Sequence, residues 1–377
     1  MKIMVDLRSL METGGKISGV ENYLLNVLPL IHSEENSFSG FYNSFKDVYM
    51  PEFKKGFNVT RRSIPNKILN TTLSFFSFPK FEKLFGSFDV LWLPDLRPFA
   101  ISKKTKLAIT AHDLSPVMHP EYYSLKRRLW HWLIQHKRSF KRADLVFAIS
   151  EYTKSDLISL GVSEEKIKVV KHGLNHELFN TDISVEQKQE VKNKYKLPKK
   201  FLLSISTVEP RKNIEGLIKG FEMVDDPDLF LVIAGRLGWL YKGVLELANR
   251  SNKKEQIIFT GYVDEKDKPA LISSAHIVCY PSFYEGFGFV PLEAMACGVP
   301  VITSARTSMA EICGDSALLI EPYQLPELVN AIKALNTDDV LRVHFTEKGL
   351  EHVKGFSWEK SALEIQRGLI QLAQTKV

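Results

Sequence analysis

The chain has 377 residues, of which 44% are hydrophobic and 25% are charged, and these values are typical of a soluble globular protein. The length favours two domains over one. The formal net charge of +6 is too small and too diffuse to indicate nucleic-acid binding, although it suits anionic ligands or an anionic membrane surface. No apolar run approaches the ~20 residues that cross a bilayer, so we expect no membrane-spanning helix.

Two further features indicate a cytoplasmic protein. The first apolar run contains Asp6 and Arg8, which argues against a signal peptide. The three cysteines have neither metal-ligand spacing nor a Cys-x-x-Cys motif, and we expect reduced thiols that serve packing: Cys279, Cys297 and Cys313. The alternative is a cytoplasmic protein that also contacts the inner face of the membrane peripherally.

Short apolar runs alternate with helical patterns along most of the chain. The first series of predicted strands comprises residues 2–7, 89–94, 106–113, 144–150 and 167–171. The second series comprises residues 201–206, 229–235, 257–262, 275–281, 299–303 and 317–321. Several runs are almost continuous Val, Ile and Leu, which is typical of parallel strands buried on both faces. The alternation predicts an α/β protein with two doubly wound, Rossmann-like domains.

The segment between the two series is polar, so we place the domain connection there. The predicted divisions are an N-terminal domain over 1–178, a linker over 179–200, a C-terminal domain over 201–355 and a final segment over 356–377. Ligands of open α/β sheets bind beyond the carboxyl ends of the strands. The candidate residues are therefore those that follow predicted strands.

The first strand leads into a glycine-containing loop that precedes a helical pattern. Gly14, Gly15 and Gly19 lie in this loop, and a glycine loop before a helix can cradle phosphate. The spacing is not Gly-x-Gly-x-x-Gly, so the loop alone is weak evidence.

His112 stands at the tip of the strand 106–113. A histidine at a strand end can donate to a sugar hydroxyl or stabilise developing charge. The alternative is a histidine whose hydrogen bonds are satisfied by local backbone.

Residues 124–142 contain seven Lys or Arg and no acid, with Leu125, Leu129, Leu133 and Phe140 at helical spacing. This pattern suits an interfacial helix on anionic lipid, but a packed core stripe with a solvated basic face is the more common case. The earlier stretch 63–85 is also aromatic and basic, and its apolar surface suits an acceptor or membrane contact.

Arg211 and Lys212 follow the strand 201–206 and precede a helical pattern. Cationic side chains beside exposed helix N–H groups form an anion site, because the dipole and the charges act together. The alternative is an exposed basic turn.

The stretch FYEGFGFVPLEAM follows the strand 275–281. Gly286 and Gly288 allow close approach of backbone to a ligand, and Pro291 suits a first helical turn. Glu293 then lies in that turn, where it can accept hydrogen bonds from the vicinal hydroxyls of ribose or complement the helix dipole. Glu285 has no adjacent helix end to explain it.

Together these motifs resemble the GT-B-fold glycosyltransferases of family 4, over nearly the whole chain. The stretch EGFGFVPLEAMACGVPVI is similar to that family's E-x7-E region, with Glu285 and Glu293 as the two glutamates. The segments STVEPRKNIEGLIKGF, AHD, ISEYTKSDL and VVKHGLN follow in the family's order. The sequence departs from many members at Ser206 and Thr207, where an arginine is common, and in its longer N-terminal glycine loop.

The resemblance implies roles for these residues. Arg211 and Lys212 would bind the donor diphosphate, and Glu293 the ribose. The donor sugar would be held by Glu285, His112 and the backbone around three loop residues: Gly286, Phe287 and Gly288. Gly15 and Gly19 would belong to a loop near the diphosphate and the acceptor.

The resemblance also implies an activity. Two domains facing a cleft would transfer a hexose with retention, with no metal or other cofactor, from GDP-mannose or a UDP-hexose to a saccharide or lipid-linked acceptor. Mannose is favoured, because HDLSPVMHPEYYS and EPRKN resemble bacterial mannosyltransferases of lipopolysaccharide assembly. A nucleotide-sugar epimerase and a catalytically weak binding subunit are the alternatives. In GT-B proteins the last helix, expected here from Trp358 to Ala373, commonly crosses back to the N-terminal domain.

Overall fold

The computed structural model describes residues 1–11, 19–31, 37–45, 53 and 57–375. The chain divides into two compact units. The first unit comprises Met1–Met118, Leu125–Gly173 and Ser357–Val377, and the second comprises His119–Ser124 and Leu174–Phe356. Residues 179–200, where the sequence predicts a linker, contain a helix and group with the second unit.

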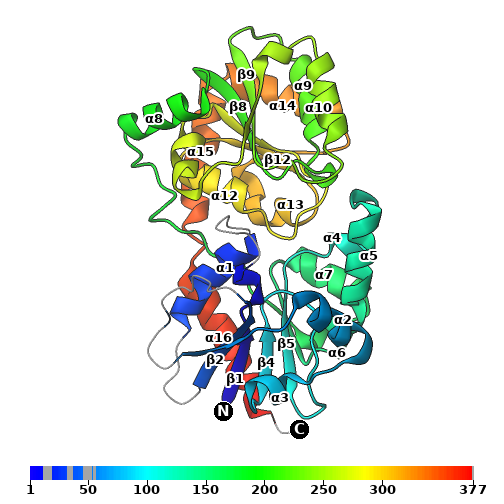
Figure 1. The fold of residues 1–377 in the computed structure, drawn as a ribbon. Coiled ribbons are helices and arrows are strands. Elements are labelled where there is room, and N and C mark those ends of the chain that lie inside the picture. The colour runs from blue at the N-terminus through cyan, green and yellow to red at the C-terminus, as the bar shows by residue number, and fades with distance from the viewer. Residues whose placement is uncertain (12–18, 32–36, 46–52, 54–56, 376–377) are drawn as a thin grey trace. The chain divides into compact units, whose positions relative to one another are not determined.

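The first unit is built on a seven-stranded sheet with the order β3-β2-β1-β4-β5-β6-β7, in which every pairing is parallel (Figure 1). Its strands are β1 (Lys2–Asp6), β2 (Ser37–Asn43), β3 (Asn58–Arg62), β4 (Val90–Leu93), β5 (Lys106–Ala111), β6 (Leu145–Ala148) and β7 (Ile167–Val169). Its helices are α1 (Gly19–Val27), α2 (Asn66–Phe76), α3 (Phe81–Phe85), α4 (Ser115–Met118), α5 (Leu125–Ile134), α6 (His136–Arg142), α7 (Glu151–Ser159) and α16 (Trp358–Gln374).

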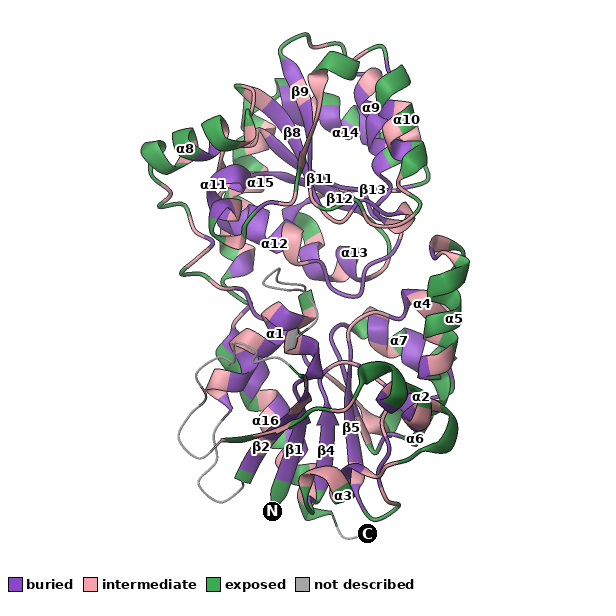
Figure 2. Cartoon of the chain, in the orientation of Figure 1, coloured by how far each residue is buried: buried purple, intermediate pink, exposed green. Residues whose placement is uncertain are grey.

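The central strands are apolar because helices cover the sheet. Figure 2 shows β1, β4 and β5 buried along almost their whole length. Two strands of this sheet, β2 and β3, are absent from the sequence prediction. The strand β2 contains serine and glycine in place of a Val/Ile/Leu run, and β3 is a polar edge strand with no fully buried residue. Such strands lack the continuous apolar pattern that identifies the others.

The helix α16 joins the first unit at the end of the chain. Ser357 caps it, because its side chain accepts a hydrogen bond from the backbone N–H of Lys360. Gly173 makes the close approach possible: a Cβ on Gly173 would lie 2.2 Å from the backbone nitrogen of Trp358. The Ser361 hydroxyl then donates to the Lys171 carbonyl at 2.6 Å.

The basic aromatic segment 124–142 is less buried than a core stripe. Leu125 and Leu129 on α5 are 80% and 60% exposed, whereas Phe140 on α6 is buried. The expectation that both leucines pack into the core is therefore wrong. Neighbouring elements cover only the C-terminal end of this segment, and Figure 2 shows α5 mainly exposed.

The second unit has a six-stranded parallel sheet with the order β10-β9-β8-β11-β12-β13. Its strands are β8 (Lys200–Ile205), β9 (Leu229–Ala234), β10 (Ile257–Gly261), β11 (Ile277–Tyr280), β12 (Val301–Ser304) and β13 (Leu318–Ile320). Its helices are α8 (Val185–Tyr195), α9 (Ile214–Glu222), α10 (Lys242–Arg250), α11 (Lys268–Ser273), α12 (Phe289–Ala296), α13 (Ser308–Cys313), α14 (Leu325–Thr337) and α15 (Asp339–Val353).

The cysteines all lie in this second unit. Cys279, Cys297 and Cys313 are buried and free of disulfide bonds, which agrees with their predicted packing role. Burial raises the pKa of the Cys297 and Cys313 thiols to about 12, so both stay protonated at neutral pH. In the part of the chain that is described, no helix is both long and apolar enough to cross a bilayer.

Candidate active site

The candidate site of the second unit forms where two neighbouring strands end. Strands β8 and β11 are hydrogen-bonded neighbours, so the segments after them meet at one edge of the sheet. The backbone N–H of Phe283, after β11, donates to the carbonyl of Arg211, after β8, at 2.7 Å. This contact brings three of the predicted residues together: Arg211, Lys212 and Glu285.

Glu285 is held between the two cations. Lys212 Nζ lies 2.5 Å from Glu285 Oε1, and Arg211 Nη1 lies 2.9 Å from Glu285 Oε2. Lys212 Nζ also donates to the Tyr280 hydroxyl at 2.6 Å, and Arg211 Nε lies 2.5 Å from Glu209 Oε1. The exposed basic turn, which was the alternative for Arg211 and Lys212, is therefore wrong, because Lys212 is only 8% exposed.

This cluster is electrostatically matched. Burial alone would raise the pKa of Glu285, but Arg211 and Lys212 outweigh burial and hold that pKa at about 2. Burial and the neighbouring Arg211 lower the pKa of Lys212, while Glu285 and Glu209 oppose this effect. Because a carboxylate lies in direct contact with its ammonium group, we expect Lys212 to be charged at neutral pH.

The start of α9 adds a helix N-terminus to the cluster. Asn213 has the left-handed φ of 54° and caps this helix, because its side chain accepts from the backbone N–H of Gly216 at 3.2 Å. Its amide also donates to the Pro322 carbonyl at 3.0 Å, which fixes the turn that carries Lys212. A helix N-terminus and two cations together favour an anionic ligand.

The glycine loop after Glu285 is tightly enclosed. Gly288 has a φ of 104° and precedes α12, and a Cβ there would lie 2.0 Å from Met309 Cε. The Ser308 hydroxyl donates to the carbonyls of Glu285 and Phe287 at 2.9 and 3.2 Å. The loop that contains Gly286, Phe287 and Gly288 is buried, so its backbone is held in one conformation next to Glu285.

Glu293 belongs to a second ion-pair cluster. It lies on α12, is 2% exposed, and is 3.3 Å from Lys268 Nζ, which is also 3.3 Å from Glu265. Burial raises the pKa of Glu293, and Lys268 opposes this effect. Lys268 is the first residue of α11, and no local sequence pattern marks it as a partner of Glu293.

His112 lies in the first unit, beyond the end of β5. Its Nε2 is 2.7 Å from the Pro94 carbonyl, so Nε2 carries the hydrogen. Its Nδ1 is 3.3 Å from His172 Nε2, which must then be the donor in this pair. Burial lowers the pKa of both imidazoles, and this favours two neutral rings. His172 belongs to the VVKHGLN motif, which does not by itself mark this histidine as a partner of His112.

The N-terminal glycine loop is only partly described. Gly19 is the first residue of α1, whereas Gly15 lies outside the described residues. Tyr23, one turn after Gly19 on α1, is fully buried, and its ring centroid lies 4.8 Å from that of His112. A phosphate-binding role for this loop stays a prediction.

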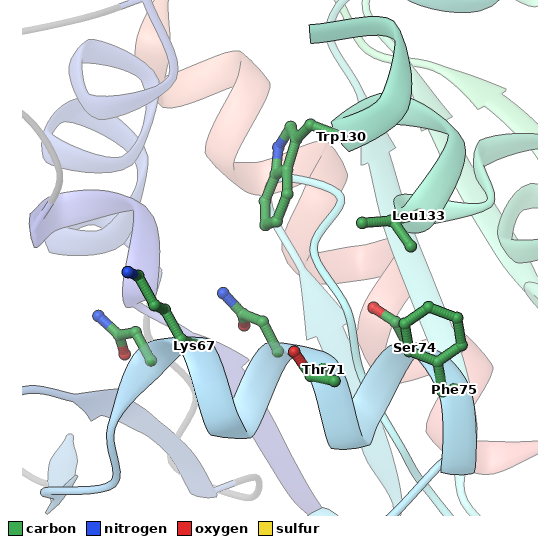
Figure 3. Close-up of a pocket in the computed structure, with 8 residues that line it drawn as sticks. Lys67, Thr71, Ser74, Phe75, Trp130 and Leu133 are labelled. Atoms are coloured by element: carbon green, nitrogen blue, oxygen red, sulfur yellow. The ribbon is translucent and has the colours of Figure 1, made fainter. Parts of the chain in front are cut away.

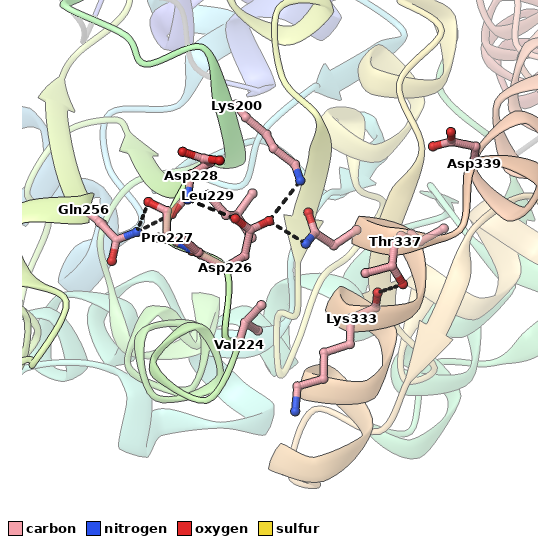
Figure 4. Close-up of polar contacts among 12 residues, drawn as sticks. Lys200, Val224, Asp226, Pro227, Asp228, Leu229, Gln256, Lys333, Thr337 and Asp339 are labelled. Carbon is pink, nitrogen blue, oxygen red and sulfur yellow. Dashed lines mark hydrogen bonds and ion pairs between the residues drawn. The ribbon is translucent and has the colours of Figure 1, made fainter.

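The acidic run DDPD forms a loop at the opposite edge of the second sheet, before β9. Asp226 accepts from Lys200 Nζ at 2.9 Å and from Asn336 Nδ2 at 2.8 Å, while Gln256 donates to the carbonyls of Pro227 and Leu229 (Figure 4). These bonds hold the pKa of Asp226 at about 2, mainly through Asn336 and then Lys200. The run is therefore a loop held in place by hydrogen bonds and an ion pair within the second unit.

Comparison with known proteins gives two family matches and a set of relatives. Residues 17–178 match the family described as Glycosyltransferase Family 4, and residues 185–352 match Glycosyl transferases group 1. O-antigen chain mannosyltransferase B of Escherichia coli is 33% identical over 267 residues, which cover 69% of each chain. Serotype-specific mannosyltransferase WbdA of Escherichia coli is 29% identical over 276 residues, but the match spans only 34% of WbdA.

Solved structures agree in fold. Sucrose-phosphate synthase from Thermosynechococcus elongatus superimposes with a TM-score of 0.78 at 21% identity, with 99% of each chain covered. Anabaena Alr3699/HepE in complex with UDP and glucose superimposes with a TM-score of 0.73 at 19% identity, covering 98% of this chain and 100% of that chain. The predicted fold class, two Rossmann-like α/β domains of the GT-B type, is confirmed. The chain belongs to family 4 of the glycosyltransferases and is a glycosyltransferase.

Proposed function

We propose that this protein transfers mannose from GDP-mannose to a saccharide or glycolipid acceptor during synthesis of a surface polysaccharide. A UDP-hexose is the alternative donor. The single observation that carries the proposal is the cluster in which Arg211 and Lys212 surround Glu285 beside the start of α9. The choice of mannose is supported by the names of the relatives, which are O-antigen mannosyltransferases.

In the proposed mechanism, Arg211 and Lys212 bind the donor diphosphate. Two of the three ammonium protons of Lys212 have partners among the described residues, Glu285 and Tyr280, and the third is then available to a phosphate oxygen. Negative charge grows on the diphosphate as the glycosyl bond breaks. Fixed cations and helix N–H groups stabilise that charge without reorganisation, so no divalent metal is required in this mechanism.

Glu285 has two parts in this proposal. It keeps both cations in place, and it accepts hydrogen bonds from hydroxyls of the donor sugar. Glu293 binds the ribose, in exchange for part of its contact with Lys268. His112 contributes to the sugar-binding side through its imidazole or its backbone, because both ring nitrogens already have protein partners. Retention at the anomeric carbon is carried over from the family resemblance.

A transfer assay tests this function directly. Purified protein is incubated with GDP-mannose, UDP-glucose or UDP-galactose and a mannose oligosaccharide acceptor, with and without EDTA. The proposal expects mannosylated product that is insensitive to EDTA and has the axial anomeric configuration of the donor by NMR. Product from a UDP-hexose alone, or dependence on a divalent metal, would contradict the corresponding part of the proposal.

We further propose peripheral contact with the cytoplasmic face of an anionic membrane. This is supported by Leu125, Leu129 and Trp132, which are 80%, 60% and 68% exposed on a helix that has only basic charged residues. Apolar side chains beside lysines and arginines are typical of interfacial helices. In a flotation assay with anionic vesicles at low salt, the protein should float and Leu125→Asp/Leu129→Asp should not. Failure of the wild type to float would exclude the contact.

A further inference from the structure

A groove of about 310 Å³ lies between α2 and α5 in the first unit, and the site described above does not include it. Figure 3 shows α2 on one side of this groove and Trp130 and Leu133 of α5 on the other. Five of its eight lining residues are polar, and all five come from α2: Asn66, Lys67, Asn70, Thr71 and Ser74.

The spacing on α2 explains why these side chains line one groove. Leu69 and Leu73 turn into the core, whereas positions 67, 70, 71 and 74 share an adjoining face of the helix. The Thr72 hydroxyl is used within the helix, where it donates to the Leu69 carbonyl at 3.0 Å. In contrast, the side chains of Asn70, Thr71 and Ser74 make no recorded hydrogen bond to another described residue.

The amide of Asn66 is oriented by the protein. Its Oδ1 accepts a hydrogen bond from Asn43 Nδ2 at 2.6 Å, and the same Asn43 group donates to the Ile64 carbonyl at 2.7 Å. This bond fixes the amide plane of Asn66 at the entry to α2. The polar wall of the groove therefore combines one oriented amide with a second amide and two hydroxyls one to two turns further along the helix.

The opposite wall is aromatic. Trp130 is 42% exposed, and Leu133 follows it by one helical turn. An exposed indole offers a flat apolar face at a low cost in side-chain entropy, because its side chain has only two rotatable bonds. Phe75 adds a second aromatic side chain to the lining of the groove.

This combination matches one class of ligand. A sugar ring has an apolar face of C–H groups and a rim of hydroxyls, so it can stack on an indole while amides and hydroxyls bind its rim. A lipid chain would leave the Asn70 amide without a hydrogen-bonding partner among the described residues, which is costly. Lys67 is the one charged residue that lines the groove, so the groove lacks the clustered cations that a nucleotide diphosphate needs.

We propose that the groove between α2 and α5 binds neutral sugar units of the acceptor saccharide. The inference rests on the proposed function only in identifying the saccharide as the acceptor; the binding itself is independent of transfer.

Soluble α-linked mannose disaccharides and tetrasaccharides, which carry no lipid, are the probes for this groove. Isothermal titration and tryptophan fluorescence should both report binding to the wild type. Trp130→Ala should weaken it about tenfold or more, since a lost aromatic contact is worth about one order of magnitude. Trp132→Ala is the matched control, because Trp132 lies on the same helix and is 68% exposed but does not line the groove. The double variant Asn70→Ala/Thr71→Ala should also weaken saccharide binding.

Two results would overturn the inference. These are absence of saccharide binding to the wild type, or equal saccharide affinity of the Trp130→Ala and Trp132→Ala variants. Thermal stabilisation by GDP-mannose, measured on the same proteins, separates this inference from the proposed function. If GDP-mannose does not stabilise the wild type, the result counts against the proposed function. If GDP-mannose stabilises both proteins and Trp130→Ala binds the saccharide as tightly as the wild type, the result counts against the groove alone.

Discussion

The two units carry very different chemistry on the same kind of sheet edge. Beyond β8 and β11 of the second unit, two cations and two carboxylates form a row of ion pairs. Glu209 contacts Arg211, Arg211 contacts Glu285, and Glu285 contacts Lys212, each within 3 Å. At the corresponding edge of the first sheet, His112, His172 and Tyr23 form a neutral cluster, and the buried Arg8 nearby is paired with Asp6 at 2.6 Å. Both edges are built by parallel strands, so the difference comes from the loops and not from the architecture.

This difference indicates separate tasks for the two units in the proposed reaction. In the proposed mechanism, the cations of the second unit stabilise a diphosphate that gains charge, whereas the neutral histidine–tyrosine cluster of the first unit suits an uncharged sugar. Charge neutralisation is worth more to catalysis than a neutral contact, so variants of the second unit should have the largest effects on activity.

The largest effect is expected from Lys212→Ala. Removal of one fixed donor from a developing anion typically costs about 3 kcal/mol, so turnover should fall by roughly a hundredfold or more while the protein stays folded. Steady-state kinetics measure the loss, and circular dichroism checks the fold. Lys219→Ala, at an exposed lysine on α9, is the control and should keep wild-type turnover. A Lys212→Ala enzyme within threefold of wild type would remove the basis of the proposed mechanism.

Glu285→Gln should reduce both activity and stability. The variant leaves Arg211 and Lys212 with one fewer buried counter-charge, and breaking a buried ion pair costs about 3 kcal/mol. Urea unfolding should show this loss, and transfer should fall without any new requirement for a divalent metal. Wild-type stability together with wild-type transfer would mean that Glu285 neither positions the cations nor binds the sugar.

Acid should weaken the first unit through its histidine pair. Burial lowers the pKa of both His112 and His172, so stability is fully present above the ordinary histidine pKa of about 6.5 and is lost as the pH falls through the lower folded values. His172→Gln keeps a donor for His112 but cannot titrate, and it should show a smaller drop in melting temperature between pH 7.5 and 5.5 than the wild type. The exposed His344→Gln is the control. An unchanged drop in His172→Gln would contradict the neutral pair.

The smallest effect is expected from Asp226→Asn, at the opposite edge of the second sheet. The variant weakens the contacts with Lys200 and Asn336, which should cost about 1 kcal/mol at neutral pH. Because the folded pKa of Asp226 is about 2, this contribution is present above pH ~4 and is lost as the pH falls toward 2. Urea unfolding at pH 7 measures the loss, and transfer should stay at the wild-type level. A large loss of transfer would give this loop a role in the reaction.

Much of the fold could be predicted because buried parallel strands have a distinctive composition. The runs that became β8, β9 and β11 are almost entirely apolar, whereas β2 and β3 contain polar residues and were missed. Arg211, Lys212 and Glu285 could be found because each follows a recognisable strand.

The partners of these residues were harder to predict. Lys268 contacts Glu293, which is 25 positions away in the sequence, and His172 contacts His112, which is 60 positions away. No local sequence pattern marks such pairs. The exposure of Leu125 and Leu129 could not be decided from the sequence, because a helical stripe of leucines has the same spacing whether or not another element covers it.

The central claim is that Arg211 and Lys212 bind the diphosphate of the nucleotide donor. Isothermal titration of GMP and GDP to the wild type and to Lys212→Ala tests it most directly, because the second phosphate is the only difference between the ligands. GDP should bind the wild type at least about tenfold more tightly than GMP, and Lys212→Ala should lose most of this difference. The same GDP-to-GMP ratio in both proteins would contradict it.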